Sequence, residues 1–331
     1  MKNNDRPRLV DPFGRVIDYV RVSLTDKCNF RCFYCLPKGA KEFEPPENYL
    51  GPDELVRVIK AFSELGVRRI RLTGGEPLVR KDLTNIAHQI GHMDGIEDLS
   101  LSTNASLLAP HAKSLKQAGI SRVNVSLDTL DPDRFREITN ADLQPVLDGL
   151  MATRKAGLEP VKINMVVIKG VNDDEVVDMA DFCIEHGFTL RYIETMPIGD
   201  TGRDASDQYL SLDIVKQRLE QKFRLIPSVM KGGGPARYFK IDNTDLNIGF
   251  ITPISQHFCE TCNRIRLAVD GTLYLCLGQE NSYALKPLLR AGVDDHELKQ
   301  AIVEALALKP EKHEFRDKPD TVVRFMSSTG G

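Results

Sequence analysis

The sequence predicts an α/β protein: a partial (β/α)6 TIM-like barrel followed by a C-terminal region. Strand-like and amphipathic helix-like runs alternate from about residue 18 to residue 197. Each strand-like run has one apolar face and one polar face, and the alternation stops after Pro197. A doubly wound sheet, buried on both faces, would instead need strands that are apolar throughout.

The predicted elements follow one another in regular order. The strands are predicted at residues 19–25, 68–73, 97–104, 121–128, 160–168 and 189–196. Helices lie between them, for example over 53–65, where Leu55, Ile59 and Phe62 recur at helical spacing. Pro52 suits the first turn of that helix and Gly66 suits its C-terminal cap.

The polar faces of the strands carry the functional information. In the first strand Val20 and Val22 share one face, and Arg21 lies on the other. The remaining polar-face residues are Ser23, Thr25, Arg71, Thr73, Ser100, Ser102, Asn104, Asn124, Ser126, Asp128, Lys162 and Asn164. A closed barrel fills its lumen with branched side chains, so a polar lumen predicts an open or ligand-filled barrel. A half-exposed antiparallel sheet is the alternative, which the intervening helices disfavour.

After Pro197 the pattern becomes irregular. A helix is predicted over 211–221, a loop over 231–235 and strands within 236–252. We place the boundary near residue 215, which gives a barrel at 1–215 and a C-terminal region at 216–331.

Composition narrows the function classes. The 331 residues carry a formal net charge of −3, so no bulk charge attracts a nucleic acid or an anionic membrane. No apolar run approaches the roughly 20 residues needed to cross a bilayer, and the first residues have no signal-peptide pattern. We therefore expect a cytoplasmic protein with reduced thiols. In that compartment seven cysteines favour metal or redox chemistry over disulfides.

Three cysteines directly follow the first predicted strand. Cys28, Cys32 and Cys35 have the spacing C-x3-C-x2-C. Three thiolates can hold three irons of a [4Fe–4S] cluster and leave the fourth iron open. A structural zinc site would need a fourth ligand, and the nearest histidine in sequence is His88. Barrel enzymes also place their chemistry in loops after the strands, so this group predicts an iron–sulfur cluster.

A second group lies in the C-terminal region. Cys259 and Cys262 are followed by Cys276, and together with His257 they could form a zinc site. Beside a first cluster, a second three-thiolate [4Fe–4S] cluster is favoured, with an open iron that could bind substrate. Cys183 has apolar helical neighbours and is interpreted as a core residue.

At this point the chain resembles a known family. The Cys28 to Cys35 motif, with an aromatic residue before its last cysteine, is similar to the signature of the radical S-adenosylmethionine superfamily. Within it, the chain resembles the GTP 3′,8-cyclases of molybdenum cofactor biosynthesis (molybdenum cofactor biosynthesis protein A). The matching segments are Arg21 to Asp26, Ile70 to Pro77, Thr103-Asn104, Ser126-Leu127-Asp128, Cys259 to Arg266, Cys276 and Gly330-Gly331.

The resemblance implies a chemistry. A lyase of this family would use two [4Fe–4S] clusters and S-adenosylmethionine to convert GTP to (8S)-3′,8-cyclo-7,8-dihydroguanosine 5′-triphosphate. A 5′-deoxyadenosyl radical would take hydrogen from C3′, and the carbon radical would attack C8 of guanine. The guanine would bind the open iron of the second cluster. A partner enzyme would turn the product into cyclic pyranopterin monophosphate, and an electron donor is required. A homodimer is compatible with the sequence.

The resemblance also implies roles for particular residues. The S-adenosylmethionine contacts would be Tyr34, Gly75, Glu76, Ser126 and Met196. The GTP contacts would be Arg21, Arg71, Ser102, Lys162, Arg264, Arg266, Gly330 and Gly331, with Arg21, Arg264 and Arg266 also catalytic. Guanidinium forks suit phosphate oxygens, although a lone cation more often forms a salt bridge, and a terminal Gly-Gly could be frayed. Ser102 and Ala105 stand where the family has Thr and Gly.

Two other functions stay open at this point. A radical S-adenosylmethionine enzyme that modifies a peptide would also need the cysteines, but it gives no reason for the lumen cations. A zinc-binding module without catalysis is the other alternative.

Overall fold

The computed structural model describes residues 7–36, 43–230 and 232–330. The strands are β1 (Tyr19–Ser23), β2 (Arg69–Thr73), β3 (Asp98–Thr103), β4 (Arg122–Ser126), β5 (Lys162–Val167), β6 (Thr189–Glu194), β7 (Leu225–Ser228), β8 (Arg237–Ile241), β9 (Asn247–Ile251), β10 (Arg264–Leu267), β11 (Thr272–Tyr274) and β12 (Ser282–Ala284). The α-helices are α1 (Pro52–Glu64), α2 (Leu83–Gly91), α3 (Ala112–Gln117), α4 (Pro132–Thr139), α5 (Gln144–Ala156), α6 (Val176–His186), α7 (Gly199–Ser206), α8 (Leu212–Glu220), α9 (Lys286–Ala291), α10 (Asp295–Leu306) and α11 (Met326–Thr329).

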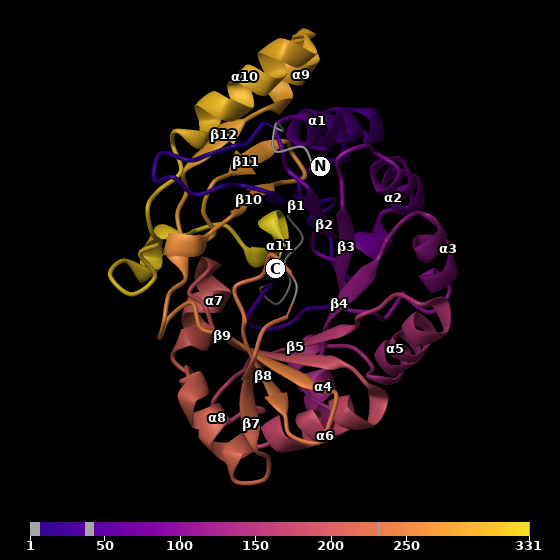
Figure 1. Ribbon diagram of the computed structural model, residues 1–331, viewed down its shortest axis with the longest axis vertical. Coiled ribbons are helices and arrows are strands. Elements are labelled where there is room, and N and C mark those ends of the chain that lie inside the picture. The colour runs from indigo at the N-terminus through magenta and orange to yellow at the C-terminus, as the bar shows by residue number, and fades with distance from the viewer. Residues whose placement is uncertain (1–6, 37–42, 231, 331) are drawn as a thin grey trace, which may run out of the picture.

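The predicted partial barrel is confirmed. Strands β1 to β6 pair in chain order, and every pair is parallel. Figure 1 shows the sheet as an open curve, with α1, α2, α3 and α5 on its outer side. All six predicted strands are present, and the helix predicted over 53–65 is α1, which begins at Pro52. The chain thus has the fold that its alternating pattern indicates.

The C-terminal region extends the sheet at both edges, which the sequence pattern does not indicate. Strand β9 pairs in parallel with β6, and β10 pairs in parallel with β1. Antiparallel strands then follow on each side, which gives the order β12-β11-β10-β1-β2-β3-β4-β5-β6-β9-β8-β7. One twelve-stranded sheet therefore crosses the proposed boundary at residue 215.

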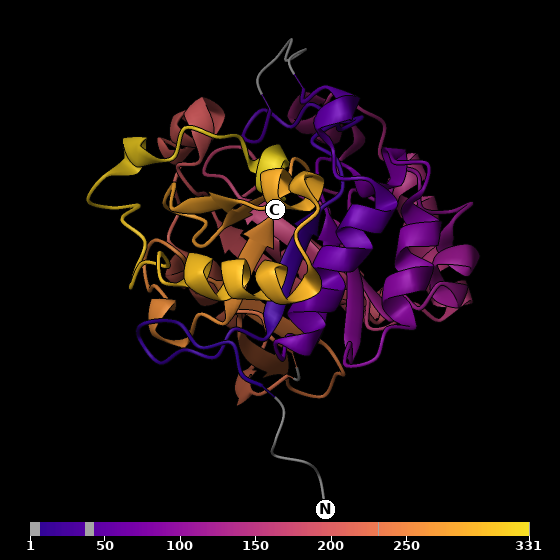
Figure 2. The same cartoon turned by 90° about the horizontal axis from the view of Figure 1, so that it is seen from above.

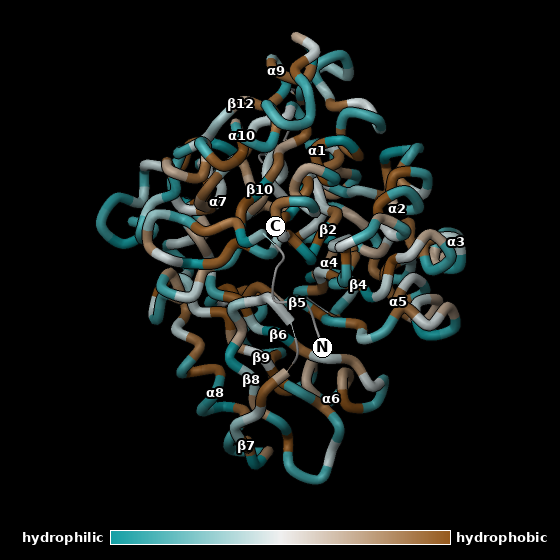
Figure 3. The backbone as a smooth tube through the Cα atoms, turned by 45° about the horizontal axis from the view of Figure 1, so that its top comes forward, coloured by the Kyte–Doolittle hydropathy of each residue, from teal (hydrophilic) through white to brown (hydrophobic). Residues whose placement is uncertain are grey.

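The core lies between the sheet and the outer helices. Val20, Val22 and Leu24 are fully buried there, as the strand parity predicts, and so is Cys183 on α6. In Figure 3 the peripheral loops are largely hydrophilic, whereas the hydrophobic stretches lie on helices and strands. Among the described helices, none is long and apolar enough to span a membrane.

Two C-terminal elements return to the barrel. Helix α10 packs beside α1, where Lys299 forms an ion pair with Glu64 (Figure 2). Helix α11 instead contacts β1 and lies inside the curve of the sheet (Figure 1). The C-terminal segment thus reaches the lumen.

Candidate active site

The lumen contains two adjoining cavities. The first is lined by the thiol groups of Cys28, Cys32 and Cys35, and the second by those of Cys259, Cys262 and Cys276. Four residues line both cavities: Asn164, Ile193, Met196 and Met326. The two cysteine groups, more than 220 positions apart in the sequence, therefore face one continuous lumen.

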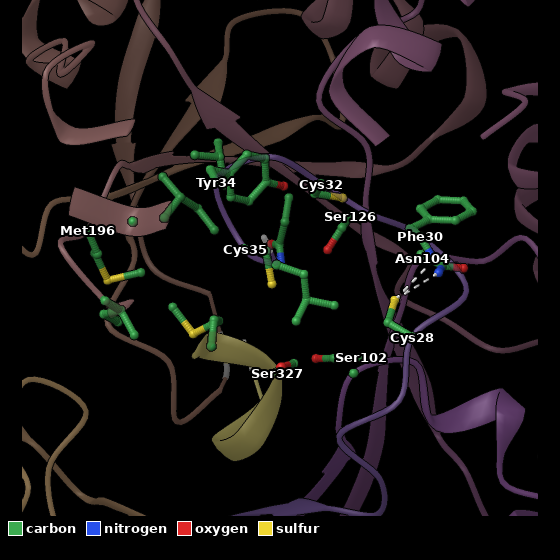
Figure 4. A pocket seen from close by; sticks show the side chains of 18 of the residues that line it. Cys28, Phe30, Cys32, Tyr34, Cys35, Ser102, Asn104, Ser126, Met196 and Ser327 are labelled. Carbon is green, nitrogen blue, oxygen red and sulfur yellow. Dashed lines mark hydrogen bonds between the residues drawn. The ribbon is translucent and has the colours of Figure 1, made fainter. Parts of the chain in front are cut away.

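Figure 4 shows how the side chains of the first cavity are arranged. The sulfur atoms of Cys28 and Cys35 point into it, as do the hydroxyl groups of Ser102 and Ser126. Met196 lies on the side opposite Cys28. Asn104 donates a hydrogen bond from Nδ2 to the sulfur of Cys28 at 3.9 Å. Among the described residues, the buried Ser102 hydroxyl has no hydrogen-bond partner, so it is available to a ligand.

Burial dominates the electrostatics of the first cavity. It raises the pKa of Cys28 to about 11 and that of Cys35 to about 12, and it raises the pKa of Cys32 as well. Among the described lining residues there is no Lys or Arg, and the one carboxylate is Glu194. With no cation on its wall, this end of the lumen suits a neutral or positively charged ligand.

The segment after β2 forms one wall of this cavity. Gly75 lies against the backbone of residues 25–27, where an added Cβ would come within 2.3 Å of the Lys27 carbonyl oxygen. Glu76 is fully buried and is not among the lining residues. Its carboxylate accepts hydrogen bonds from the Thr103 hydroxyl and the Asn104 backbone N–H, both at 2.7 Å. Burial raises the pKa of Glu76 to about 7. Glu76 thus fixes the β2 and β3 ends of the wall.

Tyr34 is fixed from the opposite side. Its hydroxyl donates to Asp128 at 2.5 Å, and the other oxygen of Asp128 accepts from the Val166 N–H at 2.8 Å. Burial raises the pKa of Asp128 to about 6. This chain of hydrogen bonds connects the first cysteine loop to β4 and β5.

Sheet register builds the wall of the second cavity. Parallel pairing places Arg21 opposite Arg71 on one side and opposite Arg266 on the other. One step earlier, Tyr19 is opposite Arg264. Because the side chains of one row point to the same face, three guanidinium groups from β10, β1 and β2 line up across the lumen. Burial, followed by the charge of Arg264, lowers the pKa of Arg266 to about 10.

This row of cations implies an anionic ligand. Five arginines and no carboxylate occur among the described residues that line the second cavity. The Nε atom of Arg266 is buried without a hydrogen-bond partner in the described part of the chain. Buried like charges are costly unless an opposite charge compensates them. The arrangement therefore suits a polyanion such as a triphosphate.

The second set of thiols differs from the first. Although burial alone would raise the pKa of Cys262, the charges of Lys309 and Arg264 lower it to about 7. Burial raises the pKa of Cys259. His257 packs against His313, with ring centroids 6.2 Å apart, and is not a lining residue. In the described ranges no three His, Cys, Asp or Glu side chains are placed as ligands of a single ion.

Two buried cations around the site, Arg191 and Lys309, were not singled out by sequence reasoning. Arg191 on β6 lines the second cavity and donates from Nη2 to Asn124 at 2.5 Å. The strand parity that identified Arg21 would have found it if applied to the sixth strand. Lys309 is 3% exposed, but no periodic signal in the sequence indicates this burial.

Lys162 was placed on the lumen face by parity. It is 4% exposed at the start of β5, with Nζ 5.7 Å from the ring centroid of Tyr238, and it lines neither cavity described above. Asn164, two residues further along the same face, lines both. Burial, followed by the charges of Arg191 and Arg122, lowers the pKa of Lys162 to about 7.

The C-terminal tail lies where the two cavities meet, since Met326 lines both. Ser327 lines the first cavity, and Arg324 donates to the carbonyl oxygens of Cys276 and Leu277 at 3.1 and 2.7 Å. Gly330 has a φ of +74°, and a Cβ there would come within 2.2 Å of Cγ2 of Thr73. Gly331 lies outside the described residues. The tail thus contacts both halves of the site.

Similar proteins agree with this geometry. A family model of the Radical SAM superfamily matches residues 22–183, and one described as Molybdenum Cofactor Synthesis C matches residues 188–315. A GTP 3′,8-cyclase of Hydrogenovibrio crunogenus is 50% identical, with 98% of this chain and 99% of the relative covered. A GTP 3′,8-cyclase of Ectopseudomonas mendocina is 48% identical, with 98% and 99% covered.

Solved structures support the fold. Streptococcus suis SuiB bound to S-adenosylmethionine superimposes with a TM-score of 0.59 at 15% identity, covering 91% of this chain and 74% of that one. At this identity the likeness concerns the fold alone. The near full-length identity to the curated relatives goes further: the chain belongs to the GTP 3′,8-cyclase family of the radical S-adenosylmethionine superfamily.

Proposed function

We propose that the chain cyclises GTP to (8S)-3′,8-cyclo-7,8-dihydroguanosine 5′-triphosphate with S-adenosylmethionine, the first step of molybdenum cofactor biosynthesis, as expected of its family. The observation that carries this proposal is that one lumen contains two adjoining cavities with different charged linings. Among the described residues, a cysteine-lined cavity with no Lys or Arg in its lining adjoins a cysteine-lined cavity with five arginines. S-adenosylmethionine carries a sulfonium cation and GTP a polyanion, so each substrate matches one end.

In the first cavity, Cys28, Cys32 and Cys35 would hold a [4Fe–4S] cluster, which would supply the one-electron chemistry that cleaves S-adenosylmethionine. Tyr34, Gly75, Ser126 and Met196 bind and orient the cosubstrate. Glu76, assigned to the same role from sequence, supports the wall through its hydrogen bonds to Thr103 and Asn104. The apolar part of the lining excludes water from the reacting carbon atoms.

In the second cavity, we propose a second [4Fe–4S] cluster on Cys259, Cys262 and Cys276, with the guanine beside it. Thiolate is the form that binds iron, and the lowered pKa of Cys262 favours that form. The alternative is a zinc ion held by these cysteines and His257. Iron analysis separates the two, because two [4Fe–4S] clusters require about eight irons per chain.

The triphosphate binds the cations of the arginine row. Arg21, Arg71 and Arg266 form that row, and Arg264 and Arg191 line the same cavity. The contacts proposed from sequence also include Lys162, which lines neither cavity, and Ser102, which lines the first. Arg21, Arg264 and Arg266 lie closest in register to the second cysteine set and are the proposed catalytic residues. Gly330 and Gly331 belong to the tail that holds the substrate in place. Residues 1–215 supply the cosubstrate site in this division, and residues 216–331 supply the second cysteine set.

The remaining assignments concern partners and location. A cytoplasmic, reducing compartment suits seven free thiols. The product passes to an enzyme that forms cyclic pyranopterin monophosphate, and an external donor supplies electrons. We also propose a homodimer as the assembly to test. Nucleic acid is not an expected ligand, since the cations are concentrated in the lumen of a chain with net charge −3.

One assay tests the central proposal. Reduced, iron-loaded protein is incubated with S-adenosylmethionine, with and without GTP, and 5′-deoxyadenosine is measured together with the cyclised nucleotide. We expect deoxyadenosine to form in step with GTP cyclisation. Cleavage that no nucleotide stimulates, but that a peptide does, would instead favour the peptide-modifying alternative.

A further inference from the structure

A buried lysine, Lys309, contacts the second cysteine set at Cys262. The proposed reaction assigns it no role. Lys309 follows α10 and is 3% exposed. Its Nζ donates to the carbonyl oxygen of Arg264 at 3.0 Å and to that of Leu275 at 2.5 Å. Its third contact is the sulfur of Cys262, at 3.8 Å. An ammonium group has three donors, and all three are directed at this loop region.

The two carbonyl groups lie next to two cysteines. Arg264 is two residues after Cys262, and Leu275 directly precedes Cys276. One ammonium group therefore connects the first residue of β10, two positions after Cys262, to the segment after β11, which contains Cys276. A buried ion is stable only where such partners surround it, so this position is specific for a cation with several donors.

A second cation fixes the segment that carries Lys309. Arg15 donates to the carbonyl oxygens of Pro310 and Glu311 at 2.7 and 2.6 Å. It also donates to the carbonyl oxygen of Cys259 at 2.9 Å. Asp11 holds this guanidinium through a buried ion pair at 2.5 Å. Arg15 thus joins the segment directly after Lys309 to Cys259, and this contact fixes the Lys309 ammonium relative to the cysteines.

We propose that Lys309 is a positioning residue for the second cluster: its ammonium group holds Cys262 and Cys276 in place and makes the cluster easier to reduce. The inference rests on the proposed second cluster. A fixed positive charge beside a cluster stabilises the reduced form, which carries one more electron, and hydrogen bonds to cluster sulfurs act in the same direction. Removal of the charge therefore lowers the reduction potential.

The test uses full-length protein in which Cys28, Cys32 and Cys35 are alanine, so that any iron belongs to the second set. Iron content and an EPR-monitored redox titration are compared for this parent and for Lys309→Gln and Lys309→Met. Gln keeps hydrogen-bond donors but no charge, and Met keeps neither. Lys286→Met is the matched control, because the Lys286 ammonium also donates to a backbone carbonyl, that of Asn48, away from the cysteines.

We expect both Lys309 variants to shift the one-electron reduction equilibrium at least tenfold toward the oxidised form, about 59 mV, and Lys286→Met to leave it unchanged. Loss of iron from Lys309→Met alone would support the anchoring role. Potentials equal to the parent in both loaded variants would overturn the inference while leaving the second cluster intact. Loss of iron from both variants, with Lys286→Met loaded, would support the anchoring of the cysteines by the Lys309 ammonium group. A parent without iron would overturn the second cluster itself, and the inference with it.

Discussion

The two cysteine sets of the lumen have opposite electrostatic surroundings. Burial, followed by the charges of Cys28 and Asp128, raises the pKa of Cys35 to about 12, whereas Lys309 and Arg264 overcome the effect of burial and lower the pKa of Cys262 to about 7. Both sets contain three thiols, so the ligand type is the same at each end. The difference lies in the side chains around them, and it is the basis of our proposal that a positively charged cosubstrate binds at one end and a polyanion at the other.

The largest effect is expected from removal of the first cysteine set. Replacement of Cys28, Cys32 and Cys35 by alanine should abolish formation of 5′-deoxyadenosine and of cyclised GTP, because the cluster proposed to deliver an electron to S-adenosylmethionine is lost while the second cluster stays. Cys183→Ala is the control: its thiol is buried in the core, so full iron content and activity are expected. Residual deoxyadenosine in the triple variant would mean that the two ends are not distinct in function.

Removal of the second cysteine set should distinguish the function of the second cavity from that of the first. With Cys259, Cys262 and Cys276 replaced by alanine, iron should fall from about eight to about four per chain. The remaining cluster should still react with S-adenosylmethionine, but GTP should no longer stimulate it and cyclised product should be absent. Retained GTP cyclisation would contradict the assignment of guanine to the second cavity.

Arg266→Ala removes one cation from the row and should spare both clusters. A hydrogen bond to a charged group contributes about 1.5–3 kcal/mol, so we expect turnover to fall by roughly 10- to 150-fold. Arg224, whose side chain is 80% exposed, provides the control. Turnover of Arg266→Ala equal to that of Arg224→Ala would refute the role of the row.

Gly330→Ala tests the tail that joins the two ends. Left-handed backbone costs a residue with a Cβ about 1–2 kcal/mol, and this Cβ also clashes with Thr73. We expect turnover to fall about tenfold. Gly292→Ala is a matched control, since Gly292 has a φ of +78° and no atom within 4 Å of an added Cβ. It should lose stability in thermal unfolding but keep its turnover. Equal turnover of the two variants would argue against the tail's role.

The smallest effect concerns pH. Burial and neighbouring cations lower the pKa of Lys162 to about 7, and a bound polyanion raises it again. Below pH 7 the amine is already charged, so binding takes up no proton there. Above pH 7 binding takes up a proton, and GTP affinity should fall by up to about tenfold per pH unit. Calorimetry at pH 6.5 and 7.5 should show a fall of about threefold in the parent but not in Lys162→Met. The same slope in both proteins would exclude Lys162 from the phosphate site.

Strand parity predicted much of the first region from sequence. Alternation along single strands placed Arg21, Arg71 and Ser126 on the lumen face, and the structure confirms that all three line a cavity. Parity is local, because successive side chains of a strand must point to opposite faces. Six strands in regular succession also predicted their parallel order.

The second region was less accessible to sequence reasoning. Most partners of Lys309 and Arg15 are backbone carbonyls from distant segments. Every residue has a carbonyl group, so no residue pattern predicts such contacts. For the same reason the pairing of β10 with β1 and of β9 with β6 was not foreseen. The family resemblance identified Arg264 and Arg266, but only the register shows that Arg266 is in the same row as Arg21.

The pairing of the C-terminal strands with β1 and β6 has a consequence for the barrel half on its own. A polypeptide that ends near residue 215 would leave the backbone N–H and C=O groups along the outer sides of both strands without β9 and β10. Uncovered strand edges form hydrogen bonds with strands of other molecules. Such a fragment should therefore aggregate even though each of its βα units is intact. During folding, β1 must also pair with β10, which is about 245 positions away in the sequence. Contacts of such separation form slowly. The C-terminal strands thus protect the barrel half from self-association, in addition to carrying their own cysteines.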